Sequence, residues 1–320
     1  MTKILITGFS GFVARYFIDR LAQEKDSYSV MGLDLNVPDF SFDKSKNVSI
    51  KFNKCNLLEK EKIEKIILNF KPDYIIHLAA FSSVGFSWQA PDLCIKNNIN
   101  IFLNIMETLR NMGYKGRVLS VGSSEEYGNY PESELPLKEE YVLCPESPYA
   151  VARVTQENLS KVYADSYDVD IVMTRSFNHI GPWQKDRFVI PSFAKQLVEI
   201  RKGIKQKKTL TTGDIDIIRD FLDVRDVVDA YFKLLQYGKK GEVYNICSGN
   251  GRSLREIIKQ MCKILELDID IVQDKQLIRP NDNKKIIGCN DKIRKHIKWQ
   301  PQYSIDESLE DIINYWKEIL

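Results

Sequence analysis

The feature that most constrains the fold of this sequence is an alternation of short β-rich runs with amphipathic helical stretches through its first half. Short, nearly continuous apolar runs are typical of strands buried on both faces. The alternation predicts a parallel sheet covered by helices on both sides. The expected strands are Lys3–Thr7, Ser29–Leu33, Tyr74–Leu78, Val118–Val121 and Ile171–Thr174, and the expected helices are Phe12–Gln23, Lys60–Asn69, about Ile95–Asn111 and about Pro148–Tyr167.

A glycine-rich turn joins the first expected strand to the first expected helix, in the pattern Gly8-x-x-Gly11-x-x-Ala14. Glycines there let the backbone approach a pyrophosphate at the positive end of the helix. Asp34 ends the next strand, where an acidic side chain would bind the adenosine ribose hydroxyls and repel a 2′-phosphate. This arrangement predicts a Rossmann-type doubly wound parallel sheet that binds NAD. A tight turn and a surface aspartate are the simpler alternatives.

Later segments should also line the cofactor site. Leu78, Ala79 and Ala80 end a strand with residues small enough for the backbone to pass close to a dinucleotide. Asn56, in the CNLLEK stretch, could face the adenine. The other residues that we expect in the cofactor site are Phe12, Val13, Leu57 and Asn98.

The strand–helix rhythm breaks after about Ser176, where loops lengthen and prolines punctuate the chain. We therefore expect residues 1–175 to form an NAD-binding domain. Residues 176–320 should form mainly a smaller α/β substrate-binding region, with some elements returning to the first domain.

The stretch SPYAVAR, residues 147–153, is the most informative for chemistry. Proline opens a helix well at its first turn, and residues four apart share one helix face, so Tyr149 and Arg153 should stand together above the sheet. A fixed cation favours the phenolate form of a neighbouring tyrosine. Such a tyrosine can exchange a proton with a sugar hydroxyl while hydride moves to or from nicotinamide. By itself the pattern also fits an ordinary tyrosine stacked on an arginine.

The stretch VGSSEEYG, residues 121–128, follows the strand before that helix. Ser123 would present a hydroxyl to the same substrate oxygen, and Glu125 would offer a carboxylate nearby. Ser124, between them, is a further catalytic candidate. An isolated motif of this kind could be a capped turn, but with the glycine turn and the tyrosine helix it makes a three-part site.

The chain resembles the extended short-chain dehydrogenase/reductase family, also called the NAD-dependent epimerase/dehydratase family, over its whole length. It is most similar to the branch that holds GDP-mannose 4,6-dehydratases and GDP-4-keto-6-deoxy-mannose reductases. GSSEEYG and FNHIGP together are fairly specific to that branch. The full set of matching stretches is ITGFSGFVA, KPDYIIHLAA, VGSSEEYG, SPYAVAR, RSFNHIGPWQ, RDFLDVRDVVDAY, VYNICSG and the RP of LIRPND.

The resemblance implies roles for individual residues. Ser123 and Tyr149 match the catalytic hydroxyl pair, and Glu125 matches the carboxylate that dehydratases use for elimination, although related reductases also have it. Asn178 matches a residue that contacts the nucleotide sugar. The other expected substrate contacts are Ser83, Val189, Lys195, Arg219 and Arg279, of which the two arginines match those expected on the diphosphate or nucleotide ribose.

Four positions depart from the family pattern. Arg153 stands where the family has lysine; it keeps the charge but is bulkier and never loses its proton. Trp183 replaces the usual glycine and suggests an altered substrate or changed release. Asp34 favours NAD, whereas the dehydratases of this branch usually prefer NADP. Ser123 replaces their common threonine and favours simple oxidation or reduction.

These features predict an NAD-dependent oxidoreductase acting at C4 of a nucleotide sugar, GDP-linked and manno-configured, in the biosynthesis of cell-surface polysaccharide. A 4-dehydrogenase and a 4-keto-6-deoxy-mannose-type reductase both fit, with a hexose or a heptose. Three alternatives stay open: a GDP-mannose-type 4,6-dehydratase, a non-catalytic nucleotide-sugar or NAD-binding protein, and an epimerase of the same fold.

Composition limits the remaining possibilities. Lys plus Arg is 46 and Asp plus Glu is 44, a net charge of +2 that gives no support to nucleic-acid or anionic-membrane binding. The six cysteines form no CxxC pair, so we expect free thiols in a reducing compartment and no metal site. The start MTKILITGF predicts a strand, not a signal peptide, and no apolar run approaches a bilayer-spanning length. We expect a cytoplasmic homodimer or homotetramer, paired through the helices near Ile95–Asn111 and Pro148–Tyr167.

Overall fold

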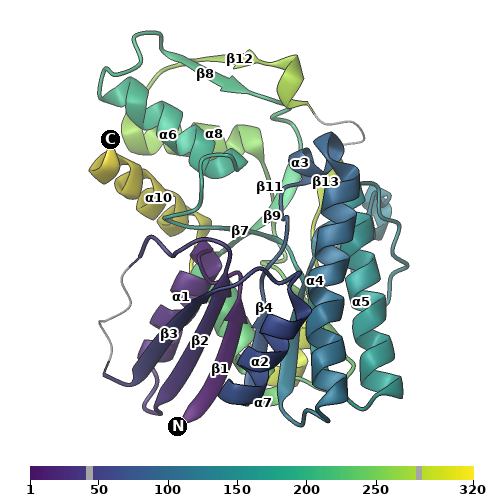
Figure 1. The fold of residues 1–320 in the computed structure, drawn as a ribbon. Helices are drawn as coiled ribbons and strands as arrows, with labels where there is room; N and C mark the ends of the chain where they lie inside the picture. Colours follow the sequence, from purple (N-terminus) through teal and green to yellow (C-terminus); the bar gives the residue numbers. More distant parts are fainter. Residues whose placement is uncertain (41–45, 279–282) are drawn as a thin grey trace.

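A seven-stranded parallel sheet forms the centre of the protein in a computed structural model that describes residues 1–40, 46–278 and 283–320 (Figure 1). Its strand order is β10-β6-β5-β4-β1-β2-β3. The strands are β1 (Thr2–Thr7), β2 (Tyr28–Asp34), β3 (Val48–Lys54), β4 (Tyr74–His77), β5 (Arg117–Ser123), β6 (Asp170–Ser176) and β10 (Val243–Ile246).

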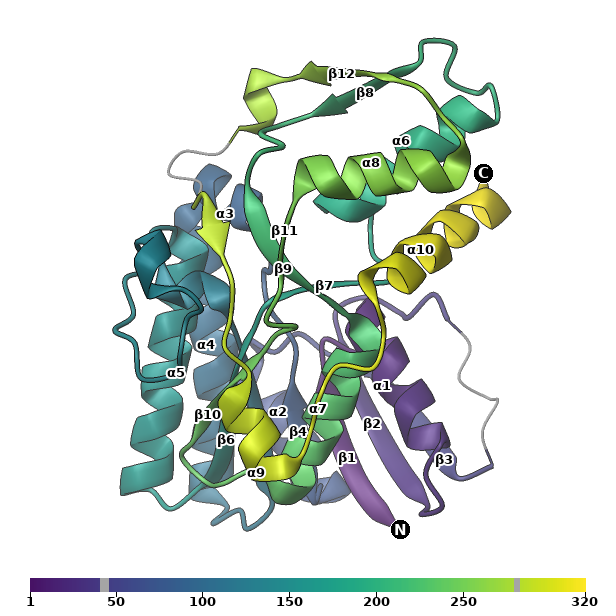
Figure 2. The ribbon, with the colours of Figure 1, turned by 180° about the vertical axis from the view of Figure 1, so that it is seen from behind.

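Helices cover both faces of this sheet, as Figures 1 and 2 show from opposite sides. One face carries α1 (Phe12–Ala22), α7 (Val224–Tyr237) and α9 (Asp291–Ile297), and the other carries α2 (Lys60–Phe70), α4 (Pro91–Asn111) and α5 (Pro148–Ser166). The short α3 (Val84–Gln89) follows β4 and packs on α4 and α5. The doubly wound α/β fold predicted from the sequence is confirmed.

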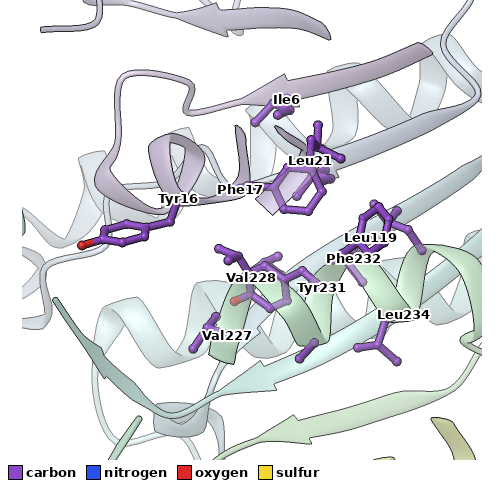
Figure 3. Packing of buried hydrophobic residues seen from close by; sticks show 14 of the residues in the cluster. Ile6, Tyr16, Phe17, Leu21, Leu119, Val227, Val228, Tyr231, Phe232 and Leu234 are labelled. Atoms are coloured by element: carbon purple, nitrogen blue, oxygen red, sulfur yellow. The ribbon is translucent and has the colours of Figure 1, made fainter. Parts of the chain in front are cut away.

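The core follows the alternation of side chains along each strand. Ile4 and Ile6 of β1 pack into the cluster under α1 and α7, whereas Leu5 packs into the cluster under α2, α4 and α5. Figure 3 shows Phe17 of α1 and Phe232 of α7 within the first cluster, and their ring centroids lie 6.5 Å apart. Because both faces are buried, the strands read as continuous apolar runs in the sequence.

The strand order reverses around β1, which lies between β2 and β4. In open parallel sheets, ligands bind beyond the carboxyl ends of the strands at such a switch point. The glycine turn follows β1, Leu78 follows β4, and both Asp34 and Ser123 end their strands, so the predicted cofactor and catalytic segments lie at one edge of the sheet.

A second group of elements lies beyond that edge (Figure 1). It contains the mixed sheet of β7 (Asn178–Ile180), β9 (Ile218–Asp223), β11 (Gly251–Ser253) and β13 (Lys285–Ile286), and the pair β8 (Thr209–Thr212) and β12 (Asp270–Gln273). It also contains the helices α6 (Val189–Arg201), α8 (Leu254–Leu265) and α10 (Ile305–Ile319), which share an apolar core. The described residues also form the 3-10 helices η1 (Ser124–Tyr127), η2 (Glu132–Glu134) and η3 (Lys275–Leu277).

The expected elements of the first half are present, with ends shifted by a few residues. The edge strand β3 was not expected, although its sequence VSIKFNK alternates apolar and polar residues, with Val48, Ile50 and Phe52 on the more buried side. Within the described ranges, the protein has no helix that is both long enough and apolar enough to cross a membrane.

Candidate functional site

The turn between β1 and α1 brings its backbone against the segment that follows β4. Gly8 has φ of +71°, and a Cβ on it would lie 2.8 Å from the Ala79 nitrogen. Gly11 donates its N–H to the Gly8 carbonyl at 3.0 Å and caps α1 without a side-chain hydrogen bond. The first turn of α1 carries no acidic residue. Its N–H groups therefore suit a phosphate.

The Asp34 carboxylate lies beside this turn. Its Oδ2 accepts from Ser10 N at 3.0 Å, and its Oδ1 accepts from Asn36 N at 3.0 Å. A carboxylate offers about four acceptor positions, so both oxygens keep capacity for ribose hydroxyls. The same negative charge opposes a 2′-phosphate.

Asn56 and Leu57 follow β3, next to Asp34 in the sheet. Cys55 N donates to the Asp34 carbonyl at 2.8 Å, which ties the two segments together. Asn56 Oδ1 accepts from Leu58 N at 3.0 Å, and the carbonyl of the buried Leu57 accepts from Asn104 Nδ2 at 3.0 Å. The structure thus brings both predicted residues to the Asp34 side of the cofactor region.

Asn98 of α4 holds the segment after β4, which contains Leu78, Ala79 and Ala80. Its Oδ1 accepts from Phe81 N at 2.8 Å, and its side chain is buried. Ala79 N donates to Thr7 Oγ1 at 3.2 Å. The segment of Leu78, Ala79 and Ala80 therefore lies beside Gly8. The hydrogen bond from Phe81 N to Asn98 positions the backbone that follows it. Direct contact of Asn98 with a cofactor stays a prediction.

The first residues of α1 connect the glycine turn to the second group of elements. Phe12 stacks on His179 of β7, with ring centroids 5.7 Å apart and an interplanar angle of 23°. Val13 is half-buried and packs against the core. Both lie where α1 begins, in the segment that should face a pyrophosphate.

Tyr149 and Arg153 meet on the buried face of α5. Arg153 Nε donates to the Tyr149 hydroxyl at 3.1 Å, and the guanidinium lies 5.2 Å from the tyrosine ring centroid. Both residues are less than a tenth exposed. The helix begins as the sequence indicates, with Pro148 in its first turn and Ser147 Oγ accepting from Ala150 N at 3.1 Å.

Ser123 ends β5 and caps the single turn η1. Its Oγ accepts from Glu125 N at 3.2 Å, which leaves the hydroxyl proton available for another acceptor. Ser124 is buried in η1, and Glu125 is half-buried. The capped turn that the motif suggested is therefore present, and it coexists with a hydroxyl at the carboxyl end of β5.

Glu126 is a buried residue at this site that the sequence reading missed. Its Oε1 accepts from Ser123 N at 2.6 Å, and the residue is fully buried. Burial, together with the Glu157 carboxylate, raises the pKa of Glu126 well above the ordinary value. A Cβ on Gly122 would lie 2.4 Å from Glu126 Oε1, so the glycine of GSSEEYG makes room for this carboxyl group.

His77 lies beneath the cofactor segment. Its Nδ1 is 2.9 Å from Thr7 Oγ1, and its Nε2 has no hydrogen-bond partner among the described residues. Complete burial, reinforced by the positive charge of Arg153, lowers the pKa of His77 to about 3. The folded protein therefore holds a neutral imidazole there, while the unfolded chain binds a proton below its ordinary pKa.

This difference predicts a loss of stability in acid. Because the unfolded state binds more protons, the contribution of His77 is complete above its unfolded pKa of 6.5 and falls as the pH drops towards about 3. We expect the free energy of unfolding to fall by about 2 kcal/mol more between about pH 7.5 and pH 5 in the wild type than in His77→Leu. Urea titrations at both pH values measure the difference, and equal pH dependence of the two proteins would contradict the assignment.

Asn178 and Arg219 lie on paired strands beyond the sheet edge. Asn178 of β7 is opposite Phe221 of β9, two residues from Arg219. The Arg219 guanidinium is buried, and its Nη1 donates to the Ile218 carbonyl at 3.0 Å and to the Asn283 carbonyl at 2.7 Å. The structure therefore brings these two candidates onto one small sheet.

The remaining substrate candidates are more scattered. Ser83 is the N-cap of α3 and accepts from Phe86 N at 3.2 Å, and Val189 begins α6. Lys195 Nζ lies 2.6 Å from the Asp186 carboxylate and over the ring of Trp316 in α10, and no interaction in the described part of the chain joins it to Asn178. Arg279 lies outside the described residues.

Trp183 occupies the third position of a turn closed by Gln184 N and the Gly181 carbonyl, 3.4 Å apart. Its φ of +64° explains why glycine suits this position. The ring is 3.5 Å from the Arg15 guanidinium and also contacts Tyr315 of α10. Trp183 thus links the cofactor helix α1 to α10.

Comparison with known protein families shows which family this chain belongs to. A family model described as GDP-mannose 4,6 dehydratase matches residues 5–312. The chain belongs to this family. The resemblance inferred from the sequence motifs is therefore confirmed, and the match spans both groups of elements.

Characterised family members and relatives share the full length of the chain. GDP-6-deoxy-D-mannose reductase of Pseudomonas aeruginosa is 33% identical over 98% of this chain and 97% of its own. The solved structure of RMD from P. aeruginosa in complex with NADPH has a TM-score of 0.87 at 32% identity and covers both chains completely. UDP-glucose 4-epimerase of Thermotoga maritima, solved with UDP-glucose, has a TM-score of 0.88 at 26% identity and covers 99% of each chain.

The protein is an NAD(P)-dependent enzyme of the short-chain dehydrogenase/reductase type, and its chemistry is oxidation or reduction of a nucleotide sugar at C4. The matched family is described by a dehydratase, and the similar proteins are named as a reductase, dehydratases and epimerases. The fold and the family therefore do not distinguish a dehydratase from an epimerase or a reductase. That distinction depends on the residues of the site.

Proposed function

We propose that this protein uses NAD to oxidise, or NADH to reduce, C4 of a GDP-linked, manno-configured hexose or heptose destined for cell-surface polysaccharide. The observation that carries the proposal is the 3.1 Å hydrogen bond from Arg153 Nε to the Tyr149 hydroxyl, next to the strand that ends at Ser123. A tyrosine held by a fixed cation beside a second hydroxyl is suited to proton exchange with a sugar alcohol.

The residues at the sheet edge fit a dinucleotide. Gly8 leaves room where a Cβ would meet the Ala79 backbone, and the uncapped start of α1 suits the pyrophosphate. Asp34 would hold the adenosine ribose and disfavour NADP. The P. aeruginosa structure was solved with NADPH, so the choice of NAD rests on Asp34. Bound NAD supplies the acceptor for the hydrogen on C4.

Residues of the protein would accept and donate the proton of the C4 hydroxyl. In the oxidative direction, the C4 hydroxyl gives its proton to the Tyr149 phenolate, and the Ser123 hydroxyl hydrogen-bonds the same oxygen. Arg153 keeps a positive charge beside the phenolate in both directions, because guanidinium does not lose its proton. In the reductive direction, the Tyr149 hydroxyl returns the proton to the carbonyl oxygen.

Support for the GDP-sugar comes from the reductase relative, which acts on GDP-6-deoxy-D-mannose by its name. Asn178 and Arg219 would contact the nucleotide end of the substrate. The division at residues 175 and 176, and a homodimer or homotetramer formed through α4 and α5, stay predictions.

A 4,6-dehydratase is the second candidate. It is favoured by the family description and by Glu125, which η1 places two residues after Ser123. Elimination would require this carboxylate to take a proton from C5 of the oxidised sugar.

A panel of GDP-, UDP- and dTDP-sugars, each incubated with the purified protein and NAD or NADP, tests the proposal. We expect mass spectrometry to show the loss of two hydrogens from a GDP-linked member, with NADH formed, or the gain of two hydrogens by a 4-keto-sugar supplied with NADH. Loss of water would favour the dehydratase. No change in mass with any member in either direction would contradict both and favour an epimerase or a non-catalytic binding protein.

A further inference from the structure

A buried polar layer lies between α5 and β5, directly behind Tyr149. Gln156 is one helical turn beyond Arg153 on α5 and is only 2% exposed. Its Oε1 accepts from Arg153 Nη1 at 2.7 Å, the shortest hydrogen bond that this guanidinium makes among the described residues. We infer that Gln156 is a positioning residue, which fixes the plane of Arg153 and so sets the Arg153–Tyr149 contact; the inference rests on the proposed function.

The orientation of the Gln156 amide is itself determined. Its Nε2 donates to Ser120 Oγ at 2.9 Å and to the Val121 carbonyl at 3.1 Å. A carbonyl only accepts, so the amide nitrogen must face β5 and the amide oxygen must face Arg153. Ser160 Oγ, on the next turn of α5, also lies 3.0 Å from Ser120 Oγ, but the Val121 backbone carbonyl fixes the Gln156 amide without it. The acceptor for Arg153 is therefore preorganised by the strand that ends at Ser123.

A guanidinium depends on a fixed orientation more than an ammonium group does. Arg153 Nη1 donates to Gln156 and to the Val121 carbonyl, and Nε donates to Tyr149. These contacts fix two of the three nitrogens of the planar Arg153 guanidinium. The third, Nη2, has no acceptor among the described residues. Without Gln156, the guanidinium could turn about the bond to its side chain and move Nε away from the phenol. A lysine ammonium is a compact charge without a plane to align.

This difference gives a specific test by a double-mutant cycle. Gln156→Met keeps the length of the side chain and removes the acceptor. We expect it to lower kcat about tenfold, since misplacement of a catalytic group is costly, with a smaller change in KM. In an Arg153→Lys background, Gln156→Met should lower kcat less than twofold further, because the group that it orients is absent.

Ser160→Ala is the matched control, since it removes a polar contact from the same buried layer and leaves the Gln156–Arg153 contact. It should keep kcat within about twofold of the wild type. The inference fails if Gln156→Met behaves like Ser160→Ala, or if its effect is the same in both backgrounds, which would indicate a structural role alone. The proposed function fails separately, if Tyr149→Phe keeps full turnover.

Discussion

Tyr149→Phe is expected to lower kcat by roughly 10²- to 10⁴-fold, the range that general acid–base catalysis by one side chain contributes. The substitution removes only the hydroxyl that accepts from Arg153 Nε at 3.1 Å, so the proton of the C4 hydroxyl has no acceptor of matched strength. The KM for the sugar nucleotide should change little. Steady-state kinetics with the substrate identified by the panel measure both quantities.

Tyr163→Phe provides the control for this experiment. Tyr163 lies on the same helix and is also buried, but its hydroxyl donates to Glu107 Oε1 at 2.5 Å, away from the sheet edge. This variant should keep kcat and lose only a little stability. Equal kcat for the wild type and Tyr149→Phe would remove the tyrosine from the mechanism.

Gly8→Ala is expected to weaken NAD binding by at least about tenfold and to destabilise the fold. A left-handed backbone costs an alanine about 1–2 kcal/mol. At Gly8 the added Cβ would also approach the Ala79 nitrogen to 2.8 Å, which must push the turn or the segment after β4 out of place. Calorimetric titration with NAD and urea unfolding measure the two effects.

Gly203→Ala separates strain from contact. Gly203 follows α6, has a nearly identical φ of +72°, and has no atom within 4 Å of an added Cβ. This variant should lose only the free energy of unfolding that corresponds to the left-handed backbone strain, and it should keep its affinity for NAD. If both variants behaved alike, the close approach of Gly8 to Ala79 would have no functional meaning.

The parts of the fold that could be predicted from the sequence share one physical property: each is determined by local pattern. The strand before Gly8 and the helix after it follow from apolar runs and a turn residue, and the Tyr149–Arg153 contact follows from helical spacing. The strand β3 was not predicted, although its sequence VSIKFNK alternates apolar and polar residues as a half-buried strand does. It pairs with β2 at the edge of the sheet.

The polar layers behind the site could not be predicted for a different reason. Glu126 and Gln156 belong to residue types that are usually exposed, and nothing in their neighbours indicates that both are buried. Their partners, Ser123 N, Arg153 and Ser120, come together only when β5 and α5 pack. The contacts of Asn98 with the backbone of residue 81 also depend on tertiary packing, and its contact with a cofactor stays a prediction.

The substrate end is the part that spacing predicts least well. Asn178 and Arg219 share a sheet because β7 pairs with β9, a contact between segments far apart in the sequence. Lys195, in contrast, is paired with Asp186. The sequence marks Trp183 as unusual at its position, but its left-handed backbone and its contact with Arg15 arise only in the folded turn.

The central claim is that hydrogen moves directly between C4 of the sugar and the nicotinamide cofactor while Tyr149 handles the proton. The most direct measurement uses the 4-hydroxy sugar nucleotide, whether the panel identifies it as the substrate or as the product, with deuterium at C4. It is incubated with the protein and oxidised cofactor, and the label is followed by mass spectrometry. We predict that the reduced cofactor carries the deuterium and that the sugar product lacks it. Deuterium retained on the sugar, at C4 or moved to C6, would contradict net oxidation at C4, and the second result would favour the dehydratase.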